Sequence, residues 1–136
     1  MTREEVLAMK PGNGNENELD ALVAEKVFGA KVMLYTPQGR YYIIDKTYLP
    51  WGEIPPYSTD ISAAWEVVGE MAKRKCYDGT PFFIQLEIRG NKCRATFMHP
   101  FIGSPAHDDR MEYVLVFSDT MPEAICKASL LAVLGL

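Results

Sequence analysis

The chain has 136 residues, of which 48% are hydrophobic. This length and hydrophobic content are sufficient for one core but too small for two stable domains, so we expect a single domain over residues 1–136. A formal net charge of -4 argues against a broad nucleic-acid-binding face, which would need clustered Lys and Arg. No run approaches the length of a membrane span, and the first ten residues lack the apolar core of a signal peptide. The sequence therefore predicts a protein that stays in the cytoplasm where it is made and has no membrane partner.

The first part of the chain predicts two helices and a hairpin. A short helix over 2–9 is followed by the turn-forming run PGNGNEN, so we expect residues 1–16 to include a flexible segment. Asn17 can cap the next helix, and Gly29 can end it. The β-rich runs 31–35 and 41–45 flank a short glycine-containing loop, which indicates a hairpin. The apolar stripe of the second helix comprises Leu19, Leu22, Val23 and Val27.

A central helix follows the prolines at 55 and 56. Ser58, Thr59 and Asp60 offer side-chain oxygens to the unpaired N–H groups at a helix start. Trp65 is predicted to anchor this helix in the core where it meets a sheet. The expected apolar face comprises Ile61, Ala64, Trp65, Val68, Met71 and Ala72, which recur at helical spacing.

The pattern over 81–98 predicts a second hairpin with a defined register. Residues 81–89 alternate apolar and polar side chains, a two-residue Gly90-Asn91 turn follows, and 92–98 returns. Pairing Arg89 with Lys92 aligns the apolar positions and places Glu87 opposite Arg94 as a favourable charge pair.

The end of the chain predicts one more strand and a closing helix. Residues 111–117 alternate, and Thr120 with Glu123 forms the pattern of a capping box before a strongly apolar helix. About five strands linked largely as hairpins and about three helices indicate the α+β class. We expect an α-β-α sandwich in which helices cover both faces of one roughly five-stranded, mostly antiparallel sheet.

Neither a metal site nor a catalytic site is predicted. Cys76, Cys93 and Cys126 have no paired spacing, so we interpret them as reduced, partly buried thiols. The histidines at 99 and 107, with Asp108 and Asp109, lack the spacing of a metal-binding motif. No pattern orients a base beside a cysteine nucleophile. We therefore expect no enzyme activity and no cofactor.

Three stretches together resemble a known family. Met1–Glu5 leads to ELDALVAEK at 18–26, PYSTDISAAWEVV occupies 56–68, and DTMPEAICKASLLAV occupies 119–133. The chain resembles the phage ABA sandwich domain family, which implies an α-β-α sandwich and a phage origin but no reaction and no catalytic residues. Size and layout also resemble the Thoeris anti-defence proteins of phages, which implies a small nucleotide ligand of the cyclic ADP-ribose type.

A nucleotide ligand needs an aromatic face for its base and arginine or N–H groups for its phosphates. The later half of the chain supplies both residue types, and Asp119 can accept a ribose hydroxyl. Alternative structural roles stay open, since Phe82 fits the core by alternation, Arg94 can pair with Glu87, and Asn91 suits a turn. The predicted ligand-binding residues are Phe82, Phe83, Arg89, Asn91, Arg94, His99, Arg110 and Asp119.

The lack of a catalytic motif, together with what the two resemblances imply, favours a non-catalytic binding protein. We expect it to sequester a small nucleotide immune signal, such as a cyclic ADP-ribose-like molecule or a cyclic oligonucleotide, in a pocket between protomers of a homo-oligomer. The alternative is a protein–protein interaction module with no small ligand. Its surface would be the aromatic edge formed by Tyr48, Trp51, Pro55 and Tyr57, which we interpret as either a lid over the core or a subunit contact.

Overall fold

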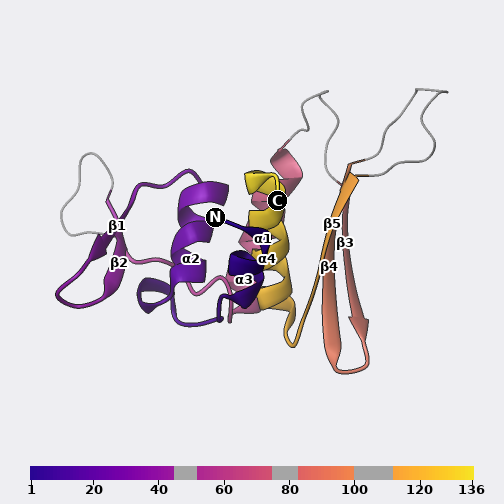
Figure 1. Cartoon of the computed structure of the whole chain (residues 1–136), viewed down its shortest axis with the longest axis horizontal. Helices are drawn as coiled ribbons and strands as arrows, with labels where there is room; N and C mark the ends of the chain where they lie inside the picture. Colours follow the sequence, from indigo (N-terminus) through magenta and orange to yellow (C-terminus); the bar gives the residue numbers. More distant parts are fainter. Residues whose placement is uncertain (45–51, 75–82, 100–111) are drawn as a thin grey trace.

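The computed structural model describes residues 1–44, 52–74, 83–99 and 112–136 (Figure 1). The α-helices in this part of the chain are α1 (Arg3–Ala8), α2 (Glu18–Leu22), α3 (Ile61–Lys73) and α4 (Met121–Leu134). A 3-10 turn, η1, spans Gly14–Glu16, and a π-helical turn, η2, extends α2 over Val23–Val27. The strands are β1 (Val32–Tyr35), β2 (Arg40–Ile43), β3 (Phe83–Arg89), β4 (Lys92–His99) and β5 (Glu112–Ser118).

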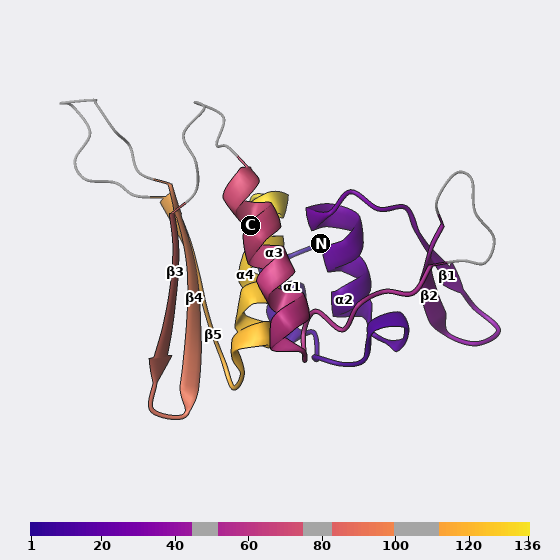
Figure 2. The same ribbon diagram turned by 180° about the vertical axis from the view of Figure 1, so that it is seen from behind.

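The strands form two separate antiparallel sheets with the helices between them. One sheet is the β1–β2 hairpin, and the other has the order β3-β4-β5. Figures 1 and 2 show the hairpin at one end of the molecule, then α2, then the group of α1, α3 and α4, and then the three-stranded sheet. The α+β class and the antiparallel pairing are confirmed. The single sheet is a correction, because in the described residues the helical layer separates the two hairpins.

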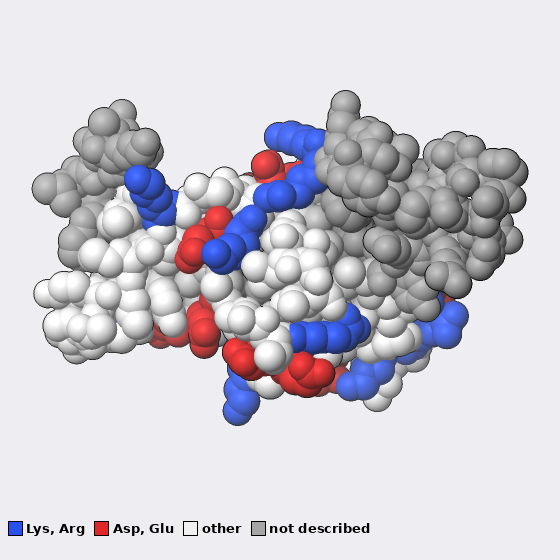
Figure 3. Space-filling model, turned by 45° about the horizontal axis from the view of Figure 1, so that its top comes forward, with Lys and Arg blue, Asp and Glu red and all other residues white. Residues whose placement is uncertain are grey.

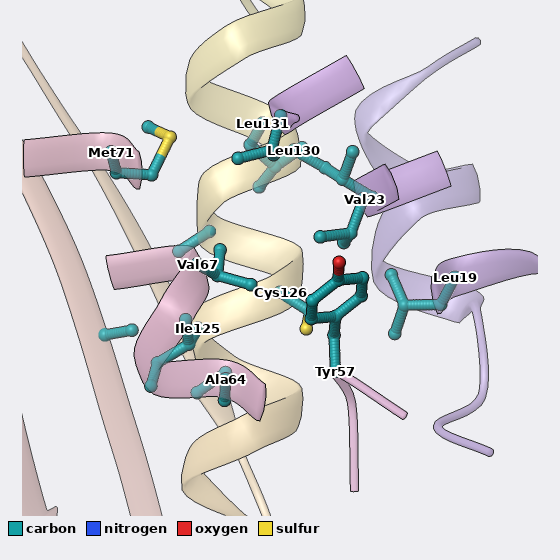
Figure 4. Close-up of a cluster of buried hydrophobic side chains, with 14 of the residues drawn as sticks. Leu19, Val23, Tyr57, Ala64, Val67, Met71, Ile125, Cys126, Leu130 and Leu131 are labelled. Atoms are coloured by element: carbon teal, nitrogen blue, oxygen red, sulfur yellow. The ribbon is translucent and has the colours of Figure 1, made fainter. Parts of the chain in front are cut away.

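Helix α4 is the centre of the core. Its residues are apolar nearly all round, and most of them are buried, which suits a helix with neighbours on several sides. It contacts α1, α2, η2, α3, β4 and β5. Figure 4 shows Ile125, Cys126 and the leucines at 130 and 131 on α4, between side chains of α3 and those of α2 with η2.

The predicted helix starts are confirmed by their caps. The Asp60 carboxylate accepts a hydrogen bond from the Ser62 backbone at 2.8 Å, and Asn17 accepts one from Asp20 N–H at 3.0 Å. Thr120 Oγ1 accepts from Glu123 N–H at 3.4 Å. In a capping box the glutamate also accepts a hydrogen bond from the N–H of the cap residue. This part of the prediction is wrong, because the Glu123 carboxylate instead accepts from Lys127 Nζ at 2.7 Å. None of the described helices is long and apolar enough to cross a bilayer.

The predicted inner face of α3 is partly wrong. Its fully or nearly buried residues are Ala63, Ala64, Val67 and Met71, whereas Trp65 is 60% exposed and Ile61 is 53% exposed. The main neighbour of α3 is α4 rather than a sheet. Small alanines allow this close helix–helix contact, which turns the bulky Trp65 outward instead of into the core.

The hairpin β3–β4 has the predicted register. Ile88 pairs with Cys93, Leu86 with Ala95, and Glu87 with Arg94. The other predicted hairpin is also present, with Val32 paired to Ile43 at one end and Tyr35 to Arg40 at the other.

Candidate functional site

The three-stranded sheet has one face that packs on α4 and a second face on which no described helix lies. Ala95, Phe97 and Val116 are buried on the face that packs against α4. Neighbouring positions along a strand point to opposite sides, so Glu87, Arg94, Thr96 and Phe117 lie on the other face. Figure 1 shows no described helix on that side of the sheet. We call this surface the open face.

Charged side chains on the open face form a linked cluster. The Glu87 carboxylate pairs with Arg94 and accepts a hydrogen bond from Arg89 Nε at 2.6 Å. The hydrogen bond from Arg89 is the main cause that lowers the pKa of Glu87, with the charge of Arg94 also contributing. Glu87 therefore stays ionised at neutral pH and holds both guanidinium groups in place.

Two polar atoms on the open face have no hydrogen-bond partner among the described residues. Arg94 Nε and Thr96 Oγ1 are both buried, and neither is paired within that part of the chain. Thr96 is only 3% exposed, and the Arg94 side chain is 17% exposed. Buried polar groups in native proteins are nearly always paired, so two unpaired ones at successive outward positions of β4 need an explanation. A bound polar ligand is one such explanation.

Phe117 supplies an apolar surface beside these groups. It pairs directly with Arg94 across β4 and β5 and is 50% exposed. An exposed aromatic ring beside a guanidinium group offers a stacking surface for a planar ring. Our sequence reasoning missed both Phe117 and Thr96, because it expected a helix to cover this face. The alternation over 111–117 already indicated this position, because it places the side chains of Phe117 and the buried Val116 on opposite faces of the sheet.

The structure brings four of the predicted site residues to one end of the sheet. Arg89, Asn91, Arg94 and Asp119 lie at or near the β3–β4 turn and the end of β5. Asp119 pairs with Lys92, so this carboxylate is engaged in an ion pair, which lowers its pKa chiefly through the hydrogen bond from that lysine. Asn91 lies in the exposed turn.

The other four predicted residues are not placed as a site. Phe82 and Arg110 lie outside the described residues, as do Cys76 and most of the loop over 99–110. Phe83 is the first residue of β3 and pairs with Met98, and His99 ends β4 and pairs with Glu112. Only their backbone pairing is described.

The predicted aromatic edge is only partly a surface. Tyr57 is buried and stacks on Phe28 with ring centroids 5.1 Å apart, and burial is the main cause that raises its pKa to about 12. Tyr57 is therefore a core residue, and Figure 4 shows its ring near Leu19, Val23 and Cys126. Tyr48 and Trp51 lie outside the described residues.

A second buried polar cluster is fully paired and therefore structural. Asp20 is fully buried, and its carboxylate accepts hydrogen bonds from Gly14 N–H at 2.8 Å and Ser58 N–H at 2.7 Å. Asn15 likewise donates to Tyr41 C=O and accepts from Ile54 N–H. Burial raises the pKa of Asp20, and the hydrogen bonds oppose that shift. We use the name Asp20 latch for the Asp20 carboxylate together with the two N–H groups that donate to it, those of Gly14 and Ser58.

The part of the described surface that Figure 3 shows carries no strongly charged patch. Figure 3 shows Lys and Arg interspersed with Asp and Glu over the described part of one face, without a large region of a single sign. Within the described ranges, no three His, Cys, Asp or Glu residues lie close enough to hold a metal ion. Of the described cysteines, Cys126 is buried and Cys93 is half-buried, and both are free thiols.

Comparison with known proteins gives one match. The family model described as the Phage ABA sandwich domain matches residues 21–130. No curated protein and no solved structure matches the chain significantly.

Proposed function

Because the chain belongs to the phage ABA sandwich domain family, we propose that it is a phage-type protein that binds a small nucleotide and holds it without chemical change. The favoured ligand is an immune signal of the host bacterium, either a cyclic ADP-ribose-like molecule or a cyclic oligonucleotide. The protein would act in the host cytoplasm by mass action, since each bound molecule is withheld from the host effectors that need it.

The observation that carries this proposal is the pair of unpaired polar atoms on β4. Arg94 Nε can donate to a phosphate oxygen, and the Thr96 hydroxyl can donate to or accept from the same ligand. These are the groups that phosphate and ribose oxygens require. Because neither atom has a partner among the described residues, a ligand that reaches them would supply hydrogen bonds that the free protein lacks.

The charges of the cluster are compatible with an anionic ligand. Glu87 uses only part of the donor set of Arg89 and Arg94, because each guanidinium has five N–H donors. The remaining donors can bind phosphate as charge-assisted hydrogen bonds. Glu87 serves as the support that fixes the direction of both arginines.

Phe117 gives the ligand an aromatic surface next to its phosphate contacts. Its ring is half exposed and lies one strand away from Arg94 in direct register. Stacking of a base on an aromatic side chain contributes about 1–3 kcal/mol. The combination favours a nucleotide over inorganic phosphate, which has no ring to stack.

Calorimetric titration of the full chain with cyclic ADP-ribose-type nucleotides and with cyclic dinucleotides tests the proposal. We expect Arg94→Gln to weaken binding about tenfold to a hundredfold, because a charge-assisted hydrogen bond contributes about 1.5–3 kcal/mol. Arg40→Gln is the matched control, since Arg40 also has a buried, unpaired Nε but lies on the other sheet. It should bind like the wild type.

The fate of the ligand separates binding from catalysis. After denaturation of the complex, mass spectrometry should recover the nucleotide unaltered and in stoichiometric amount. Failure of every nucleotide to bind, or steady formation of a product, would refute sequestration.

A further inference from the structure

We propose that two copies of this chain form a symmetric dimer by pairing strand β3 of one with strand β3 of the other. The inference rests on the free edge of the sheet and on three exposed apolar side chains, and is independent of any ligand. The joined strands would make one continuous six-stranded sheet.

Strand β3 is the outer strand of the three-stranded sheet that the structure describes. In the described part of the chain it pairs only with β4, and all seven of its residues lie in a regular ladder without a bulge. In a hairpin with a two-residue turn, the pair that flanks the turn is hydrogen-bonded, here Arg89 with Lys92. Alternate residues then direct their backbone groups outward, so Ile84, Leu86 and Ile88 present N–H and C=O groups to the free edge. Natural edge strands are usually protected by bulges, prolines, charges or cover. Within the described residues, β3 has neither a bulge nor a proline, and its charges are limited to Glu87 and Arg89 near its end.

The side chains beside this edge are unusually apolar for a free surface. Ile88 is 72% exposed, and Leu86 and Ile84 are only partly buried against the core. Helix α3 contacts β3 and carries Trp65 and Ile61 on its exposed side. Figure 2 shows α3 and β3 running in opposite directions, which places the start of α3 near the level of the β3–β4 turn. We call the set of Ile61, Trp65 and Ile88 the apolar margin.

The sequence of β3 is complementary to itself. In an antiparallel pair centred on Leu86, Ile84 of each copy lies opposite Ile88 of the other, and Gln85 lies opposite Glu87. All outward backbone groups are then paired, and no like charges meet. Moving the two-fold axis from Leu86 to Glu87 would place Glu87 opposite Glu87 of the second copy, which is unfavourable. The pattern therefore favours the register centred on Leu86 over that alternative.

A second copy also accounts for the helical part of the apolar margin. A two-fold axis through Leu86 relates the two copies, so that each residue of the interface meets the corresponding surface of the other. Helix α4 covers β4 and β5, and α3 lies nearer to β3. The two α3 helices therefore approach each other above the joined strands, where Trp65 and Ile61 become buried. The open face does not take part in this pairing, because the new contacts lie at the β3 edge and on the side of α3.

Sedimentation velocity of the full chain tests the dimer against its 15.3 kDa monomer. We expect the wild type to sediment at twice the monomer mass at micromolar concentrations, and Ile88→Lys to sediment as a monomer. Leu34→Lys is the matched control, because Leu34 is also an exposed apolar strand residue but lies on the β1–β2 hairpin. It should remain dimeric. Circular dichroism should show that both variants are folded.

A substitution on α3 tests the same interface without changing the sequence of β3. Trp65→Gln should raise the dimer dissociation constant at least tenfold, since Trp65 would lie near the centre of the interface. A monomeric wild type at high micromolar concentration would overturn the proposal. A dimer that survives both Ile88→Lys and Trp65→Gln would do the same, because its interface would then lie elsewhere.

Discussion

Removal of the Asp20 carboxylate is expected to destabilise the fold more than its position on a short helix suggests. Its two oxygens accept hydrogen bonds from Gly14 N–H and Ser58 N–H, and the residue is fully buried. The first contact fixes the turn before α2, and the second fixes the segment before α3. Asp20→Ala therefore leaves two backbone donors in the interior without an acceptor.

The magnitude follows from those two donors. An unpaired buried polar group costs about 1–3 kcal/mol, so the pair gives about 2–6 kcal/mol before any loss of packing. Against a total stability of roughly 5–15 kcal/mol for a domain, this is a large fraction. We expect a decrease of about 4 kcal/mol in the free energy of unfolding.

Urea unfolding followed by circular dichroism measures this change from the shift in midpoint at constant slope. Asp119→Ala is the control, because that carboxylate is 77% exposed and its ion pair lies on the surface. Its midpoint should stay close to that of the wild type. If Asp20→Ala lost less than about 1 kcal/mol, the two N–H groups would have found other partners and the latch would not be needed.

Further predictions concern pH, backbone and charge. Burial raises the pKa of Asp20 in the folded protein above its unfolded value of 3.8. The contribution of this titration to the free energy of unfolding is therefore greatest below pH 3.8 and is lost as the pH rises through the folded pKa. Urea midpoints should show this pH dependence in the wild type and not in Asp20→Asn. Gly14→Ala should lose more than about 2 kcal/mol, because φ is +56° and a methyl group would overlap a carbonyl oxygen. Gly135→Ala, at φ +70° in open space, should lose only about 1–2 kcal/mol by the same assay. Lys127→Met leaves the Glu123 carboxylate, whose side chain is 14% exposed, without its ion-pair partner. We expect the free energy of unfolding to fall by about 3 kcal/mol in thermal unfolding, with partial recovery when Glu123→Gln is added.

Local patterns in the sequence were sufficient for several elements. The register of β3 and β4 follows from strict alternation and a two-residue turn, and the structure has Glu87 opposite Arg94 as expected. The caps Asp60 and Thr120 act within three residues of their own helices, so a short window contains all the information. Family membership, the α+β class and the antiparallel pairing were also correct.

The errors arise where partners are distant in sequence. Helical spacing alone cannot say whether α3 packs on a sheet or on α4, so Trp65 was assigned to the core although it is exposed. Ser58 was expected to cap α3 with its side-chain oxygen, but that oxygen accepts a hydrogen bond from Gly12 N–H, which is 46 residues away. The candidate site was predicted by residue type. Thr96 was identified only from the structure, because its hydroxyl is buried and has no partner among the described residues.

The central position of α4 has a consequence for synthesis of the protein. This helix contacts α1 and both α2 and α3, yet it follows all of them in the chain. Lys127 Nζ donates to the carbonyl oxygen of Leu7 at 2.8 Å, a contact that spans 120 residues. During translation, the earlier helices therefore have no core to join until α4 leaves the ribosome. Folding is expected to occur late and in one step, with the apolar sides of α2 and α3 exposed to chaperones until then.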